Sequence, residues 1–135
     1  NYKPRDNGII LQDSYFALKS YALMKQKYPN TLAKEVYKLL QLFPKPELAF
    51  YLTASTEERL RRNEKRNKPM AYMEKLLVSN PREFETIEKN LRDITTSLFD
   101  AEVINTQSKK PNEIALYIGN KIQERNRGDN VYERE

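Results

Sequence analysis

The chain contains no cysteine and no histidine among its 135 residues. The lack of cysteine excludes disulfides and thiolate metal sites, and it fits a reducing cytoplasm, where we expect the protein to act. The lack of histidine excludes an imidazole general base, a Ser-His-Asp triad and a histidine-based metal cluster. Any catalysis must therefore rely on carboxylates, arginines and the positioning of substrates.

Long apolar runs and glycines are also scarce. No apolar run approaches the roughly 20 residues that span a bilayer, so we expect no membrane partner. None of the three glycines, Gly8, Gly119 and Gly128, stands in the Gly-x-x-x-x-Gly-Lys-Ser/Thr frame of a phosphate-binding loop. The chain begins with Asn1 in a polar stretch, and we expect it to be a fragment whose natural N-terminus lies elsewhere.

Positive charge is concentrated in one segment. Residues 59–68 hold six basic side chains and one acid, a net of +5, which equals the net charge of the whole chain. In a helix, Arg59, Arg62 and Arg66 would share one stripe. A guanidinium group can bind two phosphate oxygens at once through parallel hydrogen bonds. This stripe of arginines could therefore cover a phosphate chain. The alternative is a solvated basic helix that is partly balanced by the glutamates of its first turn.

Short apolar runs predict three buried strands, at Ile9–Gln12, Leu48–Thr53 and Glu102–Thr106. Helical periodicity, with capping residues and prolines at the boundaries, predicts helices in segments 14–28, 31–43, 55–67, 70–78, 81–98 and 111–122. In the last of these we expect Ile114, Ala115, Ile118 and Ile122 to point inward, followed by a disordered tail at 126–135.

This alternation of strands and helices predicts one α/β domain over residues 1–135, with parallel strands covered by helices on both faces. Sheets of this kind usually have about five or six strands, so we expect N-terminal strands to be missing.

Ligands of open α/β sheets bind beyond the carboxyl ends of the strands. Asp13, segment 53–55 and segment 105–106 occupy such positions. They therefore predict one shared rim. The alternative for Asp13 and Ser14 is a simple helix cap.

Four segments, in this order, resemble the thymidylate kinase family. Gly8–Tyr15 is similar to the strand and Asp-Arg-Tyr turn that lead into the family's substrate site, and Pro46–Glu58 is similar to its Pro-Asp-Leu strand and Ser/Pro-Glu-Glu helix start. Leu60-Arg61-Arg62 with Arg66 resembles its lid, and Val103–Thr106 with Pro111–Ala115 resembles its last strand, base loop and final helix. The resemblance implies a three-layer P-loop-kinase fold that lacks the P-loop, with a lid at about residues 59–80.

The resemblance also implies a reaction, the transfer of the γ-phosphoryl group of ATP, with Mg²⁺, to dTMP or a related pyrimidine nucleotide or nucleoside. The fragment alone is expected to be inactive. The implied catalytic residues are Asp13, Arg62 and Arg66, the implied substrate-binding residues are Asp13, Ser14 and Tyr15, and the implied ATP-binding residues are Arg62, Arg66, Asn105, Thr106 and Lys109. Asp13 would approach the metal through a water molecule. Ser14 stands where the family has arginine, which removes a cation that holds the acceptor phosphate.

Two other functions remain open. One is a non-catalytic binding module with the same fold, which Ser14 favours. The other is a small basic nucleic-acid-binding domain, which is disfavoured because the nine tyrosines are spread along the chain and do not form a stacking platform. A homodimer is a further expectation, with Phe16, Tyr21 and Met24 either on a shared face or in the core of a monomer.

Overall fold

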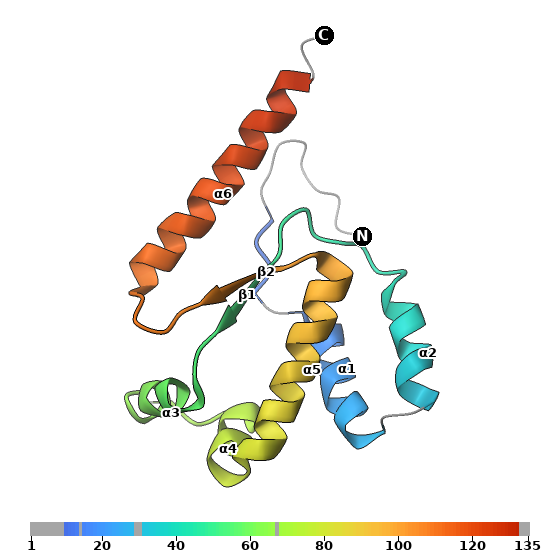
Figure 1. The fold of residues 1–135 in the computed structure, drawn as a ribbon, viewed down its shortest axis with the longest axis vertical. Coiled ribbons are helices and arrows are strands. Elements are labelled where there is room, and N and C mark those ends of the chain that lie inside the picture. The colour runs from blue at the N-terminus through green and yellow to red at the C-terminus, as the bar shows by residue number, and fades with distance from the viewer. Residues whose placement is uncertain (1–9, 14, 29–30, 67, 133–135) are drawn as a thin grey trace.

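The computed structural model describes residues 10–13, 15–28, 31–66 and 68–132 as a mixed α/β fold that is mostly helical (Figure 1). In chain order the elements are α1 (Phe16–Lys27), α2 (Thr31–Leu40), β1 (Phe50–Thr53), α3 (Thr56–Glu64), α4 (Tyr72–Ser79), α5 (Pro81–Phe99), β2 (Glu102–Asn105) and α6 (Pro111–Tyr132). Each of the six predicted helical segments overlaps one of these helices, and two of the three predicted strands are formed among the described residues.

Local sequence signals set the boundaries of the helices around the site. The Ser55 hydroxyl caps α3 by accepting a hydrogen bond from the backbone N–H of Glu58 at 3.3 Å. Asn80 caps α5 in the same way, and Pro81 occupies the first turn, where a backbone N–H is not needed. α5 ends at Phe99 and is followed by Asp100, whose φ of 50° lies in the left-handed region. This turn sends the chain directly into β2.

β1 and β2 form a parallel pair in which Phe50 is opposite Glu102 and Thr53 is opposite Asn105. The connection between them contains α3, α4 and α5. Side chains alternate along a strand, so neighbouring residues point to opposite faces. On one face Tyr51 bonds Glu88 of α5, and on the other Glu102 bonds Tyr117 of α6. The strands therefore lie between α5 and α6, as Figure 1 shows.

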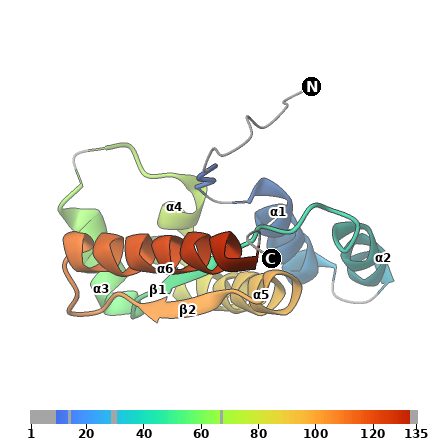
Figure 2. The same cartoon turned by 90° about the horizontal axis from the view of Figure 1, so that it is seen from above.

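The expected strand at Ile9–Gln12 is wrong for the residues that the structure describes there. Residues 10–12 belong to no strand, and Ile10 and Leu11 are 59% and 78% exposed. Ile9 lies outside the described residues. Figure 2 shows the segment 10–13 set apart from β1. An apolar run becomes a strand only where a neighbouring strand pairs with its backbone, and the described residues 10–12 are paired with no strand.

β1 has one open edge in the described part of the chain. Backbone N–H groups of Glu102 and Thr106 donate to the carbonyls of Ala49 and Thr53, at 2.9 and 2.7 Å. In a parallel ladder the residues of one strand alternate between its two edges. Phe50 and Leu52 therefore direct their backbone groups away from β2, and the Leu52 side chain is 47% exposed.

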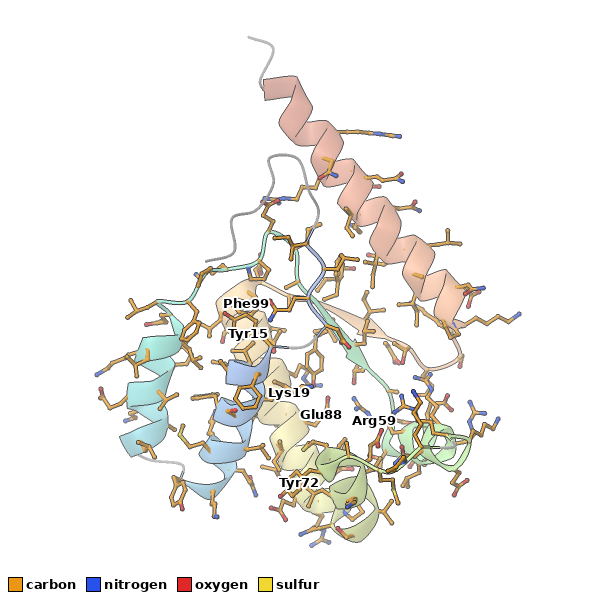
Figure 3. All side chains as sticks on the ribbon, turned by 180° about the vertical axis from the view of Figure 1, so that it is seen from behind. Tyr15, Lys19, Arg59, Tyr72, Glu88 and Phe99 are labelled. Atoms are coloured by element: carbon orange, nitrogen blue, oxygen red, sulfur yellow. The ribbon has the colours of Figure 1, made fainter. Side chains whose placement is uncertain are left out.

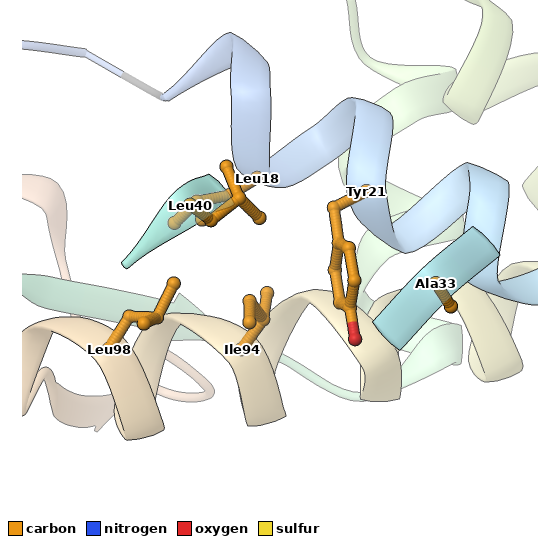
Figure 4. Close-up of a cluster of buried hydrophobic side chains, with 6 residues drawn as sticks. All are labelled: Leu18, Tyr21, Ala33, Leu40, Ile94 and Leu98. Atoms are coloured by element: carbon orange, nitrogen blue, oxygen red, sulfur yellow. The ribbon is translucent and has the colours of Figure 1, made fainter. Parts of the chain in front are cut away.

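The core is built around α5. Its predicted stripe is confirmed, since Phe84, Ile87, Ile94 and Leu98 are buried and Leu91 is half-buried. Figure 4 shows the first cluster, between α1, α2 and α5, whose buried members are Leu18, Tyr21, Ala33, Leu40, Ile94 and Leu98. The second cluster joins α1, α4 and α5 through Ala22, Leu76, Leu77, Phe84 and Ile87. Leu91 packs against both clusters and connects them.

The residues proposed for a shared dimer face do not lie together on the surface. Tyr21 is buried in the first cluster and Met24 packs against that cluster, whereas Phe16 is 83% exposed. The core position that the alternative gave these residues is confirmed for Tyr21, and Met24 is half-buried beside it. The homodimer itself stays a prediction.

α6 is longer than the sequence predicts. It continues to Tyr132, so residues 126–132 of the expected disordered tail are helical. Ile114, Ile118 and Ile122 are half-buried, but Ala115 is exposed and its predicted inward position is wrong. Within the described residues, no helix combines the length and apolar character needed to cross a bilayer.

Candidate phosphate-binding rim

The carboxyl ends of the two strands are joined by a buried threonine. Thr106 follows β2 directly and is 4% exposed. Its backbone N–H and its hydroxyl both donate to the carbonyl of Thr53, at 2.7 and 3.0 Å. The ends of β1 and β2 are therefore held together by polar contacts.

Arg62 reaches from α3 to this point. Its Nη1 donates to the Thr106 hydroxyl at 3.0 Å and its Nη2 donates to the Thr106 carbonyl at 2.9 Å. Thr106 is followed by a turn in which Asn105 Oδ1 accepts a hydrogen bond from the backbone N–H of Gln107 at 2.9 Å. The structure thus brings together three of the predicted residues, Arg62, Asn105 and Thr106.

A carboxylate lies between two of the arginines. Glu58 accepts hydrogen bonds from Arg61 Nε and Nη2 at 2.8 and 2.7 Å, and from Arg62 Nε at 2.7 Å. The Arg61 and Arg62 hydrogen bonds lower the pKa of Glu58 to about 2. The sequence led us to expect that the glutamates of the first turn would only balance the charge of the helix, but the spacing of four residues between Glu58 and Arg62 is the signal that could have predicted this pair.

Arg66 is bound to α4. Its Nη1 contacts Glu74 Oε1 at 2.5 Å, and the other oxygen of Glu74 accepts the backbone N–H of Ala71 at 2.9 Å, before the first turn of α4. Arg66 therefore ties the segment after α3 to α4. It makes no described contact with Thr106, so two of the predicted catalytic residues, Arg62 and Arg66, are held by different partners.

Arg59 belongs to the structural framework. Its Nε donates to the Ala54 carbonyl at 3.1 Å, its Nη2 lies 3.0 Å from Glu88 Oε1, and its guanidinium carbon lies 5.5 Å from the centre of the Phe84 ring. Figure 3 shows Arg59 and Glu88 facing each other. The hydroxyl of Tyr51 also donates to Glu88. Burial, and then the negative charge of Glu88, raise the pKa of Tyr51.

Two clefts flank this rim. A half-open cleft of about 200 Å³ lies between the end of β1, the start of α3 and α5, with Tyr51, Arg59 and Glu88 in its wall. A second cleft, of about 280 Å³, lies between β2 and α6, and Ile104, Lys109 and Ile114 are in its wall. The second is close to the lower size limit of ligand pockets, about 300 Å³. Lys109, predicted to approach the ATP base, thus lines a cavity with an apolar side.

Of the N-terminal candidates, Tyr15 lies away from the rim and Ser14 lies outside the described residues. Asp13 is exposed, and Ser14 is not among the described residues. The ring of Tyr15 packs edge-on against Phe43 and Phe99, with ring centres 6.2 and 5.3 Å apart (Figure 3). Phe99 ends α5, whereas Arg59 contacts its first half, so Tyr15 is not next to the arginines. Its predicted role in substrate binding stays a prediction.

Magnesium was an expected cofactor, with Asp13 as its nearest carboxylate. No group of three or more aspartate, glutamate, histidine or cysteine side chains that could hold a metal ion lies among the described residues. In phosphoryl-transfer sites Mg²⁺ is commonly held by one or two carboxylates together with substrate phosphates and water, so Mg²⁺ near Asp13 stays a prediction.

Neither the protein-family models, nor the curated proteins, nor the solved structures with which the chain was compared give a match. A function must therefore be argued from the rim itself.

Proposed function

We propose that the protein carrying this chain is a nucleoside monophosphate kinase of the thymidylate kinase type, with the P-loop-kinase fold. It would transfer the γ-phosphoryl group of ATP to dTMP or a related pyrimidine nucleotide or nucleoside. The observation that supports this best is the position of Arg62, which extends from a basic helix over the carboxyl ends of two parallel strands. Ligands of open α/β sheets bind at this end.

The chemistry of phosphoryl transfer suits such a rim, because it depends mainly on positioning and on neutralising charge on the phosphoryl oxygens. Arg62 has five N–H groups, of which three are engaged by Glu58 and Thr106. The other two can donate to phosphate oxygens while the helix remains attached to Thr106. The cleft beside Lys109 offers apolar contacts from Ile104 and Ile114, which suit the face of an adenine ring.

The open edge of β1 supports the expectation that further strands belong to this sheet. Among the described residues no strand pairs with the backbone groups that Phe50 and Leu52 direct to this edge, and the two-stranded parallel sheet formed there is far smaller than α/β sheets normally are. One strand added at this edge, leading into a phosphate-binding loop, would complete the site at the level of Thr53. We expect residues upstream of Asn1 to supply it.

The test is an assay of the protein that includes the residues encoded upstream of Asn1. With dTMP and ATP we expect ADP formation that depends on dTMP. Arg62→Lys should lower kcat by at least about 100-fold, because an ammonium group cannot replace the bidentate guanidinium. Arg82→Lys, an exposed change on α5, should leave kcat unchanged. Failure to phosphorylate any of the common nucleosides and nucleoside monophosphates would reject the proposal.

A non-catalytic nucleotide-binding module is the second candidate. Ser14 favours it, because the family's arginine at this place holds the acceptor phosphate. The same protein would then bind ATP or dTMP in a calorimetric titration without forming ADP.

A further inference from the structure

The two-arginine cluster around Glu58 has the geometry of an oxyanion site. Arg61 approaches both carboxylate oxygens, and Arg62 donates to the oxygen that Arg61 Nη2 also contacts. All three donor–acceptor distances are 2.7 or 2.8 Å. Guanidinium groups hold phosphate with the same paired, charge-assisted hydrogen bonds.

Exposure shows which member of the cluster faces the solvent. The Glu58 side chain is 14% exposed, whereas Arg61 and Arg62 are 56% and 39% exposed. The carboxylate therefore lies beneath guanidinium groups that a solute can reach. In an ordinary surface ion pair, such as Glu35 with Lys38, both side chains are largely exposed to solvent, at 67% and 68%.

The attachment of Glu58 differs from that of Glu74, the glutamate that binds Arg66. Glu74 is held to the start of α4 by the Ala71 N–H in addition to Arg66. The described side-chain bonds of Glu58 are those to Arg61 and Arg62. Rotation of Glu58 away from the arginines therefore breaks no other described contact.

We propose that Glu58 is an internal competitor, whose carboxylate occupies an oxyanion site formed by Arg61 and Arg62 and is displaced when a phosphate group binds there. That the phosphate belongs to a nucleotide rests on the proposed function. The displacement itself requires only a polyphosphate anion.

Protonation does not open this site near neutral pH. With a pKa of about 2, Glu58 stays ionised throughout the physiological range, and Arg61 and Arg62 are the charged groups that face it. Arg61 and Arg62 are thus released from Glu58 by a competing anion. The strength of their bonds to Glu58 sets the anion concentration that is required.

The experiment uses the 135-residue chain labelled with ¹⁵N and inorganic tripolyphosphate as the probe. The Nε–Hε signals of the arginines are followed by NMR at low salt. In Glu58→Gln we expect tripolyphosphate to bind about two- to five-fold more tightly than in the wild type, since one ion-pair competitor of ordinary surface strength is removed. The signals of Arg61 and Arg62 should move together during the titration.

The control variant is Glu35→Gln, which also removes one negative charge from an ion pair within one helix, but far from the arginines. It should not reproduce the gain. Arg61→Gln, made in both the wild type and Glu58→Gln, should weaken binding in each. Equal affinities for Glu58→Gln and Glu35→Gln, or shifts confined to other arginines, would overturn the proposal.

Neither outcome depends on turnover. Suppose that Glu58→Gln binds tripolyphosphate more tightly but the protein carrying the upstream residues phosphorylates no nucleotide. The role of Glu58 as a competitor is then supported, and the proposed kinase function is rejected. If phosphorylation is found and the gain is not, the kinase stands and the competitor fails.

Discussion

The hydroxyl of Tyr51 donates a hydrogen bond to Glu88, whose carboxylate is also paired with the guanidinium of Arg59. Glu88 accepts from Tyr51 and is 3.0 Å from Arg59, so three side chains from β1, α3 and α5 form one partly buried network. Networks of this kind hold separate elements in a fixed relation, because each group would be costly to leave unpaired. The network thereby fixes the start of α3 against α5.

Replacing Tyr51 with phenylalanine should lower the free energy of unfolding near pH 8 by about 1–2 kcal/mol, since a hydrogen bond to a charged group is lost. The raised pKa of Tyr51 adds a pH dependence. The unfolded chain releases this proton near pH 10 and the folded chain keeps it, so stability should fall as the pH rises above about 10. Tyr51→Phe should reduce that fall, as measured by urea unfolding between about pH 8 and about pH 11.

Tyr72→Phe is the matched control, because Tyr72 lies on α4 and is 62% exposed. Equal losses of stability for the two variants, or an unchanged pH dependence in Tyr51→Phe, would contradict the role given to the network.

The two edges of β1 should differ in amide hydrogen exchange. Tyr51 and Thr53 direct their backbone groups to β2, while Phe50 and Leu52 direct theirs to the open edge. In hydrogen exchange by NMR, the amides of Tyr51 and Thr53 should be protected, and those of Phe50 and Leu52 should exchange at least about tenfold faster. Similar protection at all four positions would mean that another segment covers the edge.

Local signals explain why the helices could be predicted from the sequence. Ser55 and Asn80 cap the following helices through contacts three residues away, and the stripe on α5 repeats at helical spacing. The segment 9–12 has the composition of a strand, but a strand also requires a partner distant in sequence. Its failure to pair is therefore not visible in its own residues.

The candidate site was predictable to a lesser degree. The meeting of segment 53–55 with segment 105–106 follows from the rule that strand ends gather on one side of a parallel sheet, whereas Arg62 was expected there from its place in the basic stripe. The partners of the arginines did not follow, because helical spacing gives the direction of a side chain and not what lies opposite. Arg59 and Arg66 are accordingly bound to Glu88 and Glu74.

At the scale of the whole molecule, fewer basic side chains are open to an external anion than the net charge of +5 suggests. The four arginines of segment 59–68 each have an acidic partner in the structure, at Glu58, Glu74 or Glu88. Affinity for nucleic acid depends on basic side chains that can neutralise backbone phosphates. Internal pairing reduces that capacity.

We therefore expect no retardation of random duplex or single-stranded DNA in gel shifts at about 150 mM salt, and only weak retardation at about 20 mM. Tight binding at the higher salt, with a steep dependence on its concentration, would favour the nucleic-acid-binding alternative. Glu58→Gln serves as an internal comparison, because it should increase any residual binding.

The pairing of Phe50 with Glu102 joins positions that are 52 residues apart, since 102 minus 50 is 52. Closing so large a loop costs chain entropy before any ladder bond is gained. We therefore expect α5 to dock before β1 and β2 meet, so that the sheet is among the last parts to form. We therefore expect that a change in α4 or α5, which make no described hydrogen bond to Thr53 or Thr106, can still weaken the contact between these two residues.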